Sequence, residues 1–232
     1  MARRAAGQER GMQVELVAAD GHRLSAWRAG PEQAPVALVV VQEIFGVNRH
    51  MRRVCDRFAQ QGYAVLAPAL FDRAEKGVEL GYTPEDVKQG LALRSAIDPA
   101  ATLLDVEAAA AALPSGARIG LIGYCWGGTV AWHGATRSEA FAASVGYYGG
   151  GIAAAREEAP RCPVQLHFGE ADTGIPMADV AAIRDAQPGI EVFTYPGAGH
   201  GFACEERGAY SPADAVLAEQ RALGFLARHL GG

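Results

Sequence analysis

Short apolar runs and amphipathic stretches alternate along most of this chain. The clearest apolar run is 35–41, Pro-Val-Ala-Leu-Val-Val-Val, which is apolar at every position. Such a run is typical of a strand that is buried on both faces of a parallel sheet. Seven other stretches predict further strands, and a hairpin turn at Asp20 and Gly21 joins the first two: 12–18, 23–28, 63–67, 118–124, 142–147, 164–168 and 190–195.

Helical patterns fill most of the intervals between these strands. In 48–61 the apolar residues recur at helical spacing, and Gly62 ends the pattern. Thr83 followed by Pro84 predicts a helix N-terminus with the threonine as N-cap. Other helices are expected over 99–113, after the 118–124 strand up to Ala135, over 176–187, and from Ser211 onward. This alternation predicts an α/β fold with a doubly wound, mostly parallel sheet and helices on both faces.

The organisation is that of one domain. The 232 residues contain no repeat, linker or low-complexity segment, so we expect a flexible N-terminal tail over 1–10 and a single domain over 11–232. Half of the residues are hydrophobic and a fifth are charged, as in ordinary globular proteins. The net charge of −5 offers no basic footprint for nucleic acid or an anionic membrane. No stretch predicts a signal peptide or a transmembrane helix.

Four cysteines occur in the sequence, at positions 55, 125, 162 and 204. None of them shows C-x-x-C spacing, which disfavours zinc ribbons and thioredoxin-like redox motifs. Without an export signal we expect free thiols in a reducing cytosol, and hence a cytoplasmic protein. Cys55 lies on the apolar side of the 48–61 helix and is expected in the core, whereas Cys162 has no evident partner.

Cys125 lies in the most informative stretch of the chain. Residues 119–130 are Ile-Gly-Leu-Ile-Gly-Tyr-Cys-Trp-Gly-Gly-Thr-Val, which predicts a strand, a sharp turn and the start of a helix. The nucleophile elbow of α/β-hydrolases has the form G-x-S-x-G, and here cysteine takes the central position. The dipole of a helix favours a thiolate at its N-terminus. The alternative is that Cys125 is a small core residue, because free cysteine is commonly buried.

Three further polar residues follow predicted strands in the same way. Glu43, Cys125, Asp172 and His200 each come soon after a strand, and the carboxyl ends of parallel strands share one edge of a sheet. The order nucleophile, acid, histidine is that of the α/β-hydrolases. Alternatives stay open: His200 as an exposed loop residue, Asp172 as a helix N-cap with Glu170 as the acid, and Glu43 as a solvated acid. The other histidines are expected at the surface or as hydrogen-bonded core residues: His22, His50, His133, His167 and His229.

At these residues the chain resembles the dienelactone hydrolase family, which has the α/β-hydrolase fold. The resemblance extends from about Met12 to the last helix. Its matching segments are Gln-Glu-Ile-Phe-Gly at 42–46, Gly-Tyr-Cys-Trp-Gly-Gly at 123–128, Gly-Tyr-Tyr-Gly at 146–149, Gly-Glu-Ala-Asp at 169–172 and His-Gly-Phe at 200–202. The cysteine in the nucleophile motif and the Gln-Glu-Ile segment are specific, whereas the acid and histidine motifs are shared by many α/β-hydrolases.

The resemblance implies a hydrolase of an ester or lactone that works through an acyl-enzyme. Cys125 would attack the carbonyl, His200 would move protons, and Asp172 would orient the imidazole. The amides of Ile44 and Trp126 would form the oxyanion hole. Neither a cofactor nor a metal is implied.

The resemblance also implies a role for Glu43. In the family the matching glutamate hydrogen-bonds the resting thiol and takes its proton when substrate arrives. A partly buried carboxyl group has a raised pKa and can accept a proton near neutrality, which agrees with that role. The partner expected is a small-molecule ester or lactone, with no nucleic acid and no membrane, and the protein is expected to be a monomer or a small homo-oligomer.

The substrate is the least determined feature. The best-known substrate of the family is a cyclic dienelactone whose carboxylate is bound by arginines. One of these lies four residues after the catalytic histidine, where this chain has Cys204 and, nearby, Arg207. The other lies in 82–90, where Lys88 is the only cation, and lysine lacks the bidentate fork of arginine. Aromatic residues are expected to line an apolar pocket or to pack in the core: Tyr82, Phe45, Trp126, Tyr148 and Phe202.

Other functions stay open at this point. A carboxylesterase or thioesterase acting on another small ester would use the same triad. In a non-catalytic thiol sensor, Cys125 would become oxidised and Cys204 would be the resolving cysteine. The candidate Asp and His argue against this function, because a sensor needs no triad. A nucleotide-binding protein is disfavoured, because G-x-G-x-x-G is missing after the first parallel strand and G-x-x-x-x-G-K is missing throughout.

Overall fold

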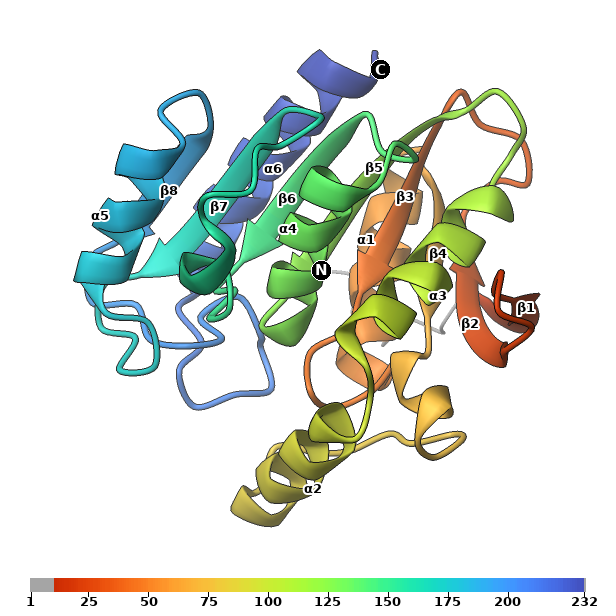
Figure 1. The fold of residues 1–232 in the computed structure, drawn as a ribbon, viewed down its shortest axis with the longest axis horizontal. Helices are drawn as coiled ribbons and strands as arrows, with labels where there is room; N and C mark the ends of the chain where they lie inside the picture. The colour runs from red at the N-terminus through yellow and green to blue at the C-terminus, as the bar shows by residue number, and fades with distance from the viewer. Residues whose placement is uncertain (1–10, 232) are drawn as a thin grey trace, which may run out of the picture.

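The computed structural model describes residues 11–231, which form a sheet between two layers of helices (Figure 1). Within this range the sheet has eight strands in the order β1-β2-β4-β3-β5-β6-β7-β8. The first two strands pair antiparallel and β2 is antiparallel to β4, whereas the pairs from β4 through β8 are parallel. The strands are β1 Met12–Val17, β2 Arg23–Ala29, β3 Val36–Val41, β4 Ala64–Pro68, β5 Arg118–Tyr124, β6 Ala143–Tyr147, β7 Val164–Gly169 and β8 Glu191–Tyr195.

Helices cover both faces of this sheet, so the predicted doubly wound α/β fold is confirmed. In Figure 1, α3, α4 and α5 lie in front of the sheet and α1 and α6 lie behind it, while α2 projects at the bottom of the view. The α-helices are α1 Arg49–Gln60, α2 Pro84–Ser95, α3 Pro99–Ala111, α4 Trp126–Arg137, α5 Met177–Ala186 and α6 Pro212–Leu230, with short 3-10 helices at η1 Leu70–Arg73 and η2 Ala153–Ala155.

Strand β3 shows why the fully apolar run predicted a central strand. It pairs with β4 on one side and β5 on the other, and no residue in it is more than 8% exposed. Successive side chains point to opposite faces of a strand. Leu38 accordingly joins the core with Phe58 of α1, whereas Val39 joins the core with Val106 of α3. The run is therefore apolar throughout because both faces of β3 are covered.

The helix ends follow the sequence signals. Thr83 caps α2 as predicted, with its hydroxyl oxygen accepting from the amide of Asp86 and the Asp86 carboxylate accepting from the amide of Thr83.

The predicted tail over 1–10 lies outside the described residues. The single domain over 11–232 stays a prediction, although the eight described strands belong to one sheet. Among the described helices, none combines the length and the apolar character needed to cross a membrane.

The carboxyl ends of the parallel strands carry the four candidate residues. Glu43 follows β3, Cys125 follows β5 directly, Asp172 follows β7, and His200 follows β8. Because these strands run parallel, the loops that follow them emerge at the same edge of the sheet. The topology therefore brings together residues that lie up to 157 positions apart in the sequence, from 43 to 200.

Candidate active site

A tight turn between β5 and α4 holds Cys125. The residue is the N-cap of α4 and has a φ of 55°, a left-handed conformation that costs energy for a residue other than glycine. A Cβ atom on Gly123 would lie 1.9 Å from the carbonyl oxygen of Gly127. A Cβ atom on Gly127 would lie 2.4 Å from the carbonyl oxygen of Val41. The flanking glycines are therefore required by the close approach of backbone segments, as the sequence indicated.

Cys125, His200 and Asp172 form a continuous chain of polar contacts. The Nε2 atom of His200 lies 3.2 Å from the Sγ atom of Cys125, and its Nδ1 atom lies 2.7 Å from Oδ2 of Asp172. The other carboxylate oxygen of Asp172 accepts from the amide of Gly174 at 2.8 Å. The arrangement can hold an imidazole in one orientation beside a thiol, which is the geometry required of a nucleophile and its base.

The alternatives for the acid are disfavoured by this geometry. Asp172 is buried and does not cap the following helix, because the N-cap of α5 is Pro176. Glu170 is exposed. Two backbone hydrogen bonds join this loop to the one that carries the histidine, from Glu170 to the oxygen of Tyr195 and from Ala171 to the oxygen of Ala198. These bonds fix the distance between the carboxylate and the imidazole.

The electrostatics of the site favour a charged imidazole. Burial disfavours the charged form, but the hydrogen bonds to Asp172 and Cys125 outweigh it and raise the pKa of His200 to about 10. His200 is therefore an imidazolium at neutral pH in this arrangement. The imidazole of His200 and the N-terminus of α4 both lie beside the Cys125 sulfur.

Glu43 is buried beside this dyad. Its side chain is 1% exposed, which rules out the solvated acid that the sequence left open. Burial raises the pKa of Glu43, and the positive charge of Arg207 opposes that effect. The Nη1 atom of Arg207 lies 3.4 Å from Oε1 of Glu43, at the long end of hydrogen-bonding range. In this conformation the Cys125 sulfur contacts His200, and the Glu43 carboxylate faces Arg207.

The loop after β3 carries the second expected oxyanion donor. The amide of Gly127 donates to the oxygen of Gln42 at 3.1 Å, and the amide of Leu80 donates to the oxygen of Phe45 at 2.9 Å. Between these anchors, the Ile44 amide donates no backbone hydrogen bond to any residue of 11–231. Trp126 is the first residue of α4, and the first amides of a helix have no acceptor within it. Both amides are thus available to a ligand.

The aromatic residues expected in the pocket divide into two groups. Tyr148 and Phe202 are fully buried, and the Tyr148 ring packs edge-on against His200 with centroids 5.2 Å apart. The Tyr148 ring also packs against that of Phe202, which belongs to the same loop as His200. Phe45 packs against Tyr82 with centroids 4.5 Å apart, and Trp126 stacks on Phe71. These two pairs lie on the side where α2 meets the body of the molecule.

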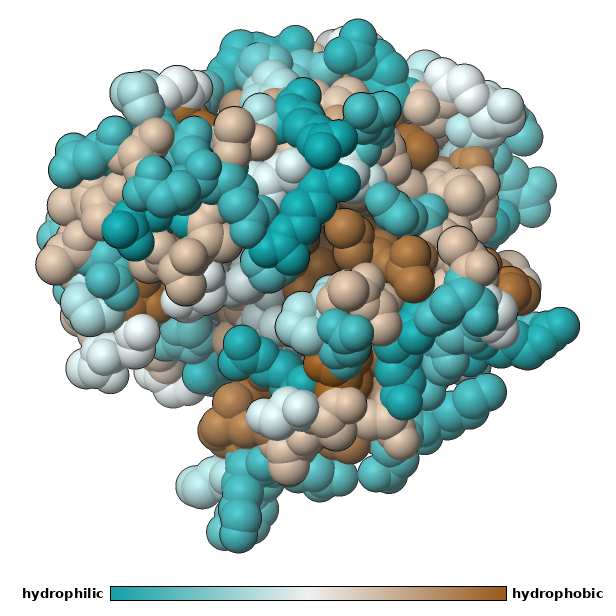
Figure 2. All heavy atoms as spheres, in the orientation of Figure 1, coloured by the Kyte–Doolittle hydropathy of each residue, from teal (hydrophilic) through white to brown (hydrophobic). Residues whose placement is uncertain are grey.

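The two candidate cations differ in position. Arg207 is part-buried beside Glu43, and its guanidinium also lies over the Phe45 ring, 5.6 Å from the centroid. Lys88 is exposed on α2. In the lower part of the face in Figure 2, around α2, hydrophobic residues interrupt the hydrophilic surface, and Leu91 of α2 is 44% exposed. Of these two cations, Arg207 is the one that the fold places next to the candidate nucleophile.

Two residues near the site were not identified from the sequence. Gly90 brings α2 against the backbone of the loop that carries Ile44. His50 was expected at the surface or as a hydrogen-bonded core residue, and this expectation is wrong. It is 1% exposed, and neither ring nitrogen has a hydrogen-bond partner among the described residues. No sequence signal marked His50, because its place beside Glu43 and Cys204 arises only from the fold.

Comparisons with known proteins identify the family. The model of the dienelactone hydrolase family matches residues 24–230. A carboxymethylenebutenolidase of Pseudomonas putida is 36% identical over 227 residues, which covers 92% of this chain and 95% of that protein. A Synechocystis protein assigned as a carboxymethylenebutenolidase is 39% identical over 208 residues, which covers 82% of this chain and 84% of that protein.

Solved structures agree with this assignment. A Klebsiella pneumoniae protein assigned to the dienelactone hydrolases has a TM-score of 0.79 and 30% identity, over 94% of this chain and 99% of that one. A dienelactone hydrolase-like promiscuous phosphotriesterase from metagenomic libraries shares the fold, with a TM-score of 0.77 and 19% identity over 95% of this chain and 99% of that one. The chain therefore belongs to the dienelactone hydrolase family, and it is a hydrolase of ester or lactone bonds.

Proposed function

We propose that this hydrolase cleaves its ester or lactone through a covalent acyl-enzyme on Cys125, with His200 and Asp172 as the other members of a triad. The observation that carries the proposal is the unbroken contact from the Cys125 sulfur through both nitrogens of His200 to the buried Asp172. A cysteine packed only for its size would not need an imidazole aligned by a carboxylate.

In the proposed mechanism the thiolate of Cys125 attacks the substrate carbonyl and forms the carbon–sulfur bond. The carbonyl oxygen becomes an oxyanion that accepts from the amides of Ile44 and Trp126. His200 gives its proton to the departing alkoxide as the carbon–oxygen bond breaks. The neutral imidazole then takes a proton from water, whose oxygen attacks the thioester and releases the acid and the thiolate.

Glu43 would act before this cycle begins. We expect it to accept the proton of the Cys125 thiol when the sulfur is turned away from His200, as its raised pKa allows. The contact between Cys125 and His200 would then represent the activated arrangement, with Glu43 held by Arg207.

For the substrate we favour an ester or lactone that carries a carboxylate. Arg207 is part-buried beside the site, and its contact with Glu43 is long, at 3.4 Å. The forked guanidinium of Arg207 can therefore turn toward an anionic ligand and bind it. Phe45, Tyr82 and Trp126 would contact the apolar part of such a substrate, while Tyr148 and Phe202 would support His200. Lys88 would contribute only if α2 moved toward the site.

A thiol sensor is the less favoured function. A resolving thiol must reach the oxidised cysteine, and Cys204 is fully buried.

The cytoplasmic location and the monomer or small homo-oligomer stay predictions, which rest on the free cysteines and on the resemblance.

The experiment compares the native chain with Cys125→Ala on a cyclic dienelactone and on p-nitrophenyl acetate. We expect turnover of at least one ester by the native chain and its loss in the variant, with a rapid release of nitrophenol before the steady state. Turnover that survives in Cys125→Ala would refute the acyl-enzyme proposal. Cys162→Ala, which removes a thiol away from the triad, is the control for general damage.

A further inference from the structure

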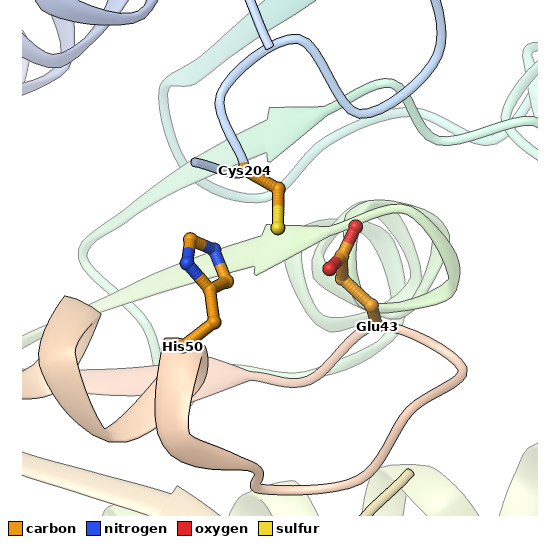
Figure 3. Close-up of side chains that lie close together, drawn as sticks. All are labelled: Glu43, His50 and Cys204. Atoms are coloured by element: carbon orange, nitrogen blue, oxygen red, sulfur yellow. The ribbon is translucent and has the colours of Figure 1, made fainter. Parts of the chain in front are cut away.

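A buried group of three potential metal ligands lies behind the active site. Glu43 follows β3, His50 is in the first turn of α1, and Cys204 is in the loop after β8. One carboxylate oxygen, one ring nitrogen and the sulfur all lie within 4.8 Å of one another. Figure 3 shows the sulfur of Cys204 pointing into the space between the imidazole and the carboxylate.

Three polar atoms of this group have no hydrogen-bond partner in the described protein, although Glu43 also contacts Arg207 and the Cys204 thiol interacts with Glu43 and Tyr82. Among residues 11–231, both ring nitrogens of His50 and the Oε2 atom of Glu43 are buried without a hydrogen-bond partner. Leaving a buried polar atom unpaired costs free energy, so several in one place need an explanation. A ligand that accepts electron pairs from nitrogen and oxygen together would remove this cost.

We propose that Glu43, His50 and Cys204 bind one Zn²⁺ ion. A thiolate, an imidazole and a carboxylate are the ligands that zinc takes in proteins, and three of them leave a fourth position for water. Ligand atoms around tetrahedral zinc lie about 3.5 Å apart, so the side chains, whose ligand atoms lie within 4.8 Å of one another, need only a small closure. The Cys204 thiol releases its proton to solvent on binding, and thiolate and carboxylate then balance the charge of the ion.

The positive groups nearby allow this binding. Arg207 and the His200 imidazolium are the cations that act on Glu43, and the charge of His200 is offset by Asp172 at 2.7 Å. Arg207 contacts Glu43 at 3.4 Å, and its part-exposed side chain can turn to solvent when the ion enters. Arg53 and Arg57 lie near His50 on α1, but Arg53 pairs with Glu205 at 2.7 Å and Arg57 with Glu219 at 3.1 Å. Their charges are therefore offset by carboxylates outside the group.

Zinc at this position would also affect catalysis. An ion that holds the Glu43 carboxylate prevents it from accepting the proton of Cys125, so zinc would inhibit hydrolysis without touching the triad. This consequence rests on the proposed function of Glu43, whereas the binding itself does not.

The test titrates the full-length, chelator-treated chain with Zn²⁺ against a chromophoric chelator, and with Co²⁺ while the ultraviolet thiolate-to-cobalt band is recorded. We expect one ion per chain and the charge-transfer band. Cys204→Ala and His50→Gln should each weaken binding by more than about 100-fold, because even the loss of an outer supporting residue costs 10–100-fold. Cys204→Ala should also remove the band.

Two control variants separate this site from others. Cys125→Ala and Cys162→Ala should both retain the ion, since neither cysteine belongs to the group. Loss of binding in Cys125→Ala with retention in Cys204→Ala would place zinc on the catalytic cysteine and histidine, and would overturn the proposal. No binding at micromolar Zn²⁺ by the native chain would also overturn it. Because binding is read without substrate, failure of the ester assay leaves this result intact.

Discussion

Gly90 of α2 lies directly against the carbonyl oxygen of Ile44, so that a Cβ atom at position 90 would be only 1.9 Å from that oxygen. The same residue, Ile44, carries the backbone amide that we expect to be one of the oxyanion donors. Helix α2, most of which is exposed, thus approaches the candidate oxyanion loop through its backbone at Gly90, while Val87 and Leu93 pack against the core cluster that contains Ile44. The absence of a side chain at position 90 permits this contact.

Gly90→Ala should therefore lower kcat/KM while changing stability little. The added methyl group must push Ile44 or α2 away, and loss of one oxyanion donor costs about 10²–10³ in rate. Alanine is favoured over glycine inside a helix by about 1 kcal/mol, which offsets part of the steric cost in the melting temperature. Steady-state kinetics and thermal melts measure the two effects. Gln89→Ala, on the exposed surface of the same helix, is the control, and an unchanged kcat/KM in Gly90→Ala would contradict this account.

Asp172→Asn should shift the alkaline limit of activity to lower pH. The hydrogen bond that His200 donates to Asp172 helps to raise the pKa of His200 to about 10, so the imidazolium persists through neutral pH and is lost above that value. Asparagine removes the charge and allows the wrong imidazole tautomer, a change that costs about 10⁴ in kcat in a serine-protease triad. The pH dependence of kcat/KM and of Cys125 alkylation by iodoacetamide measures the shift. Alkylation profiles that coincide for native and variant chains would show that Asp172 does not set the charge of His200.

Arg207→Gln should reduce kcat/KM for a carboxylate-bearing lactone more than for p-nitrophenyl acetate. A hydrogen bond to a charged group contributes about 1.5–3 kcal/mol, which corresponds to roughly tenfold or more in the ratio of the two substrates. The ratio is the measurement, because the substitution also removes the cation beside Glu43 and could slow both reactions. Lys88→Gln, on exposed α2, is the matched control and should leave the ratio unchanged. Equal losses on both substrates would assign Arg207 to Glu43 alone.

His167 should make the fold acid-sensitive. Its Nε2 atom lies 2.9 Å from Oε1 of Gln165, which only accepts, so Nε2 carries the proton and Nδ1 accepts from the Tyr195 hydroxyl at 2.7 Å. Burial lowers the pKa of His167 to about 3, so the folded chain keeps it neutral. The unfolded chain takes up a proton below about pH 6.5, and the free energy of unfolding falls as pH decreases from there.

The size of this effect can be checked directly. Between pH 7 and pH 5 the His167 contribution amounts to about 2 kcal/mol, from the difference between the two pKa values. Urea unfolding of the native chain and of His167→Gln at both pH values measures it, and the variant should lose less stability on acidification. His229→Gln, on the part-exposed side of α6, should behave like the native chain. Parallel losses in native and His167→Gln chains would mean that the histidine titrates in the folded state.

The sequence determined most of the architecture, for reasons that are local. Apolar residues at every position of 36–41 require a strand covered on both faces, and the glycines at 123 and 127 indicate a turn around Cys125 in which neighbouring positions have no room for a side chain. The caps of α2 likewise depend on residues three positions apart. Parallel strands then bring the residues after β3, β5, β7 and β8 to one edge, whatever the details of packing. The order of Cys125, Asp172 and His200 could therefore predict a candidate triad.

Only the tertiary structure decided which other residues contact the candidate triad and its neighbours at that edge of the sheet. The contact of Arg207 with Glu43 joins residues 164 positions apart, and that of Gly90 with Ile44 joins residues 46 positions apart. The buried group brings Cys204 together with Glu43 and His50, which lie more than 150 positions earlier in the sequence. No periodic pattern or short motif encodes such contacts, because they depend on how loops and helices from separate parts of the chain pack together. Local chemistry thus determined the strands, the turns and the order of the candidate triad residues, while three-dimensional packing determined the charges and unpaired atoms around them.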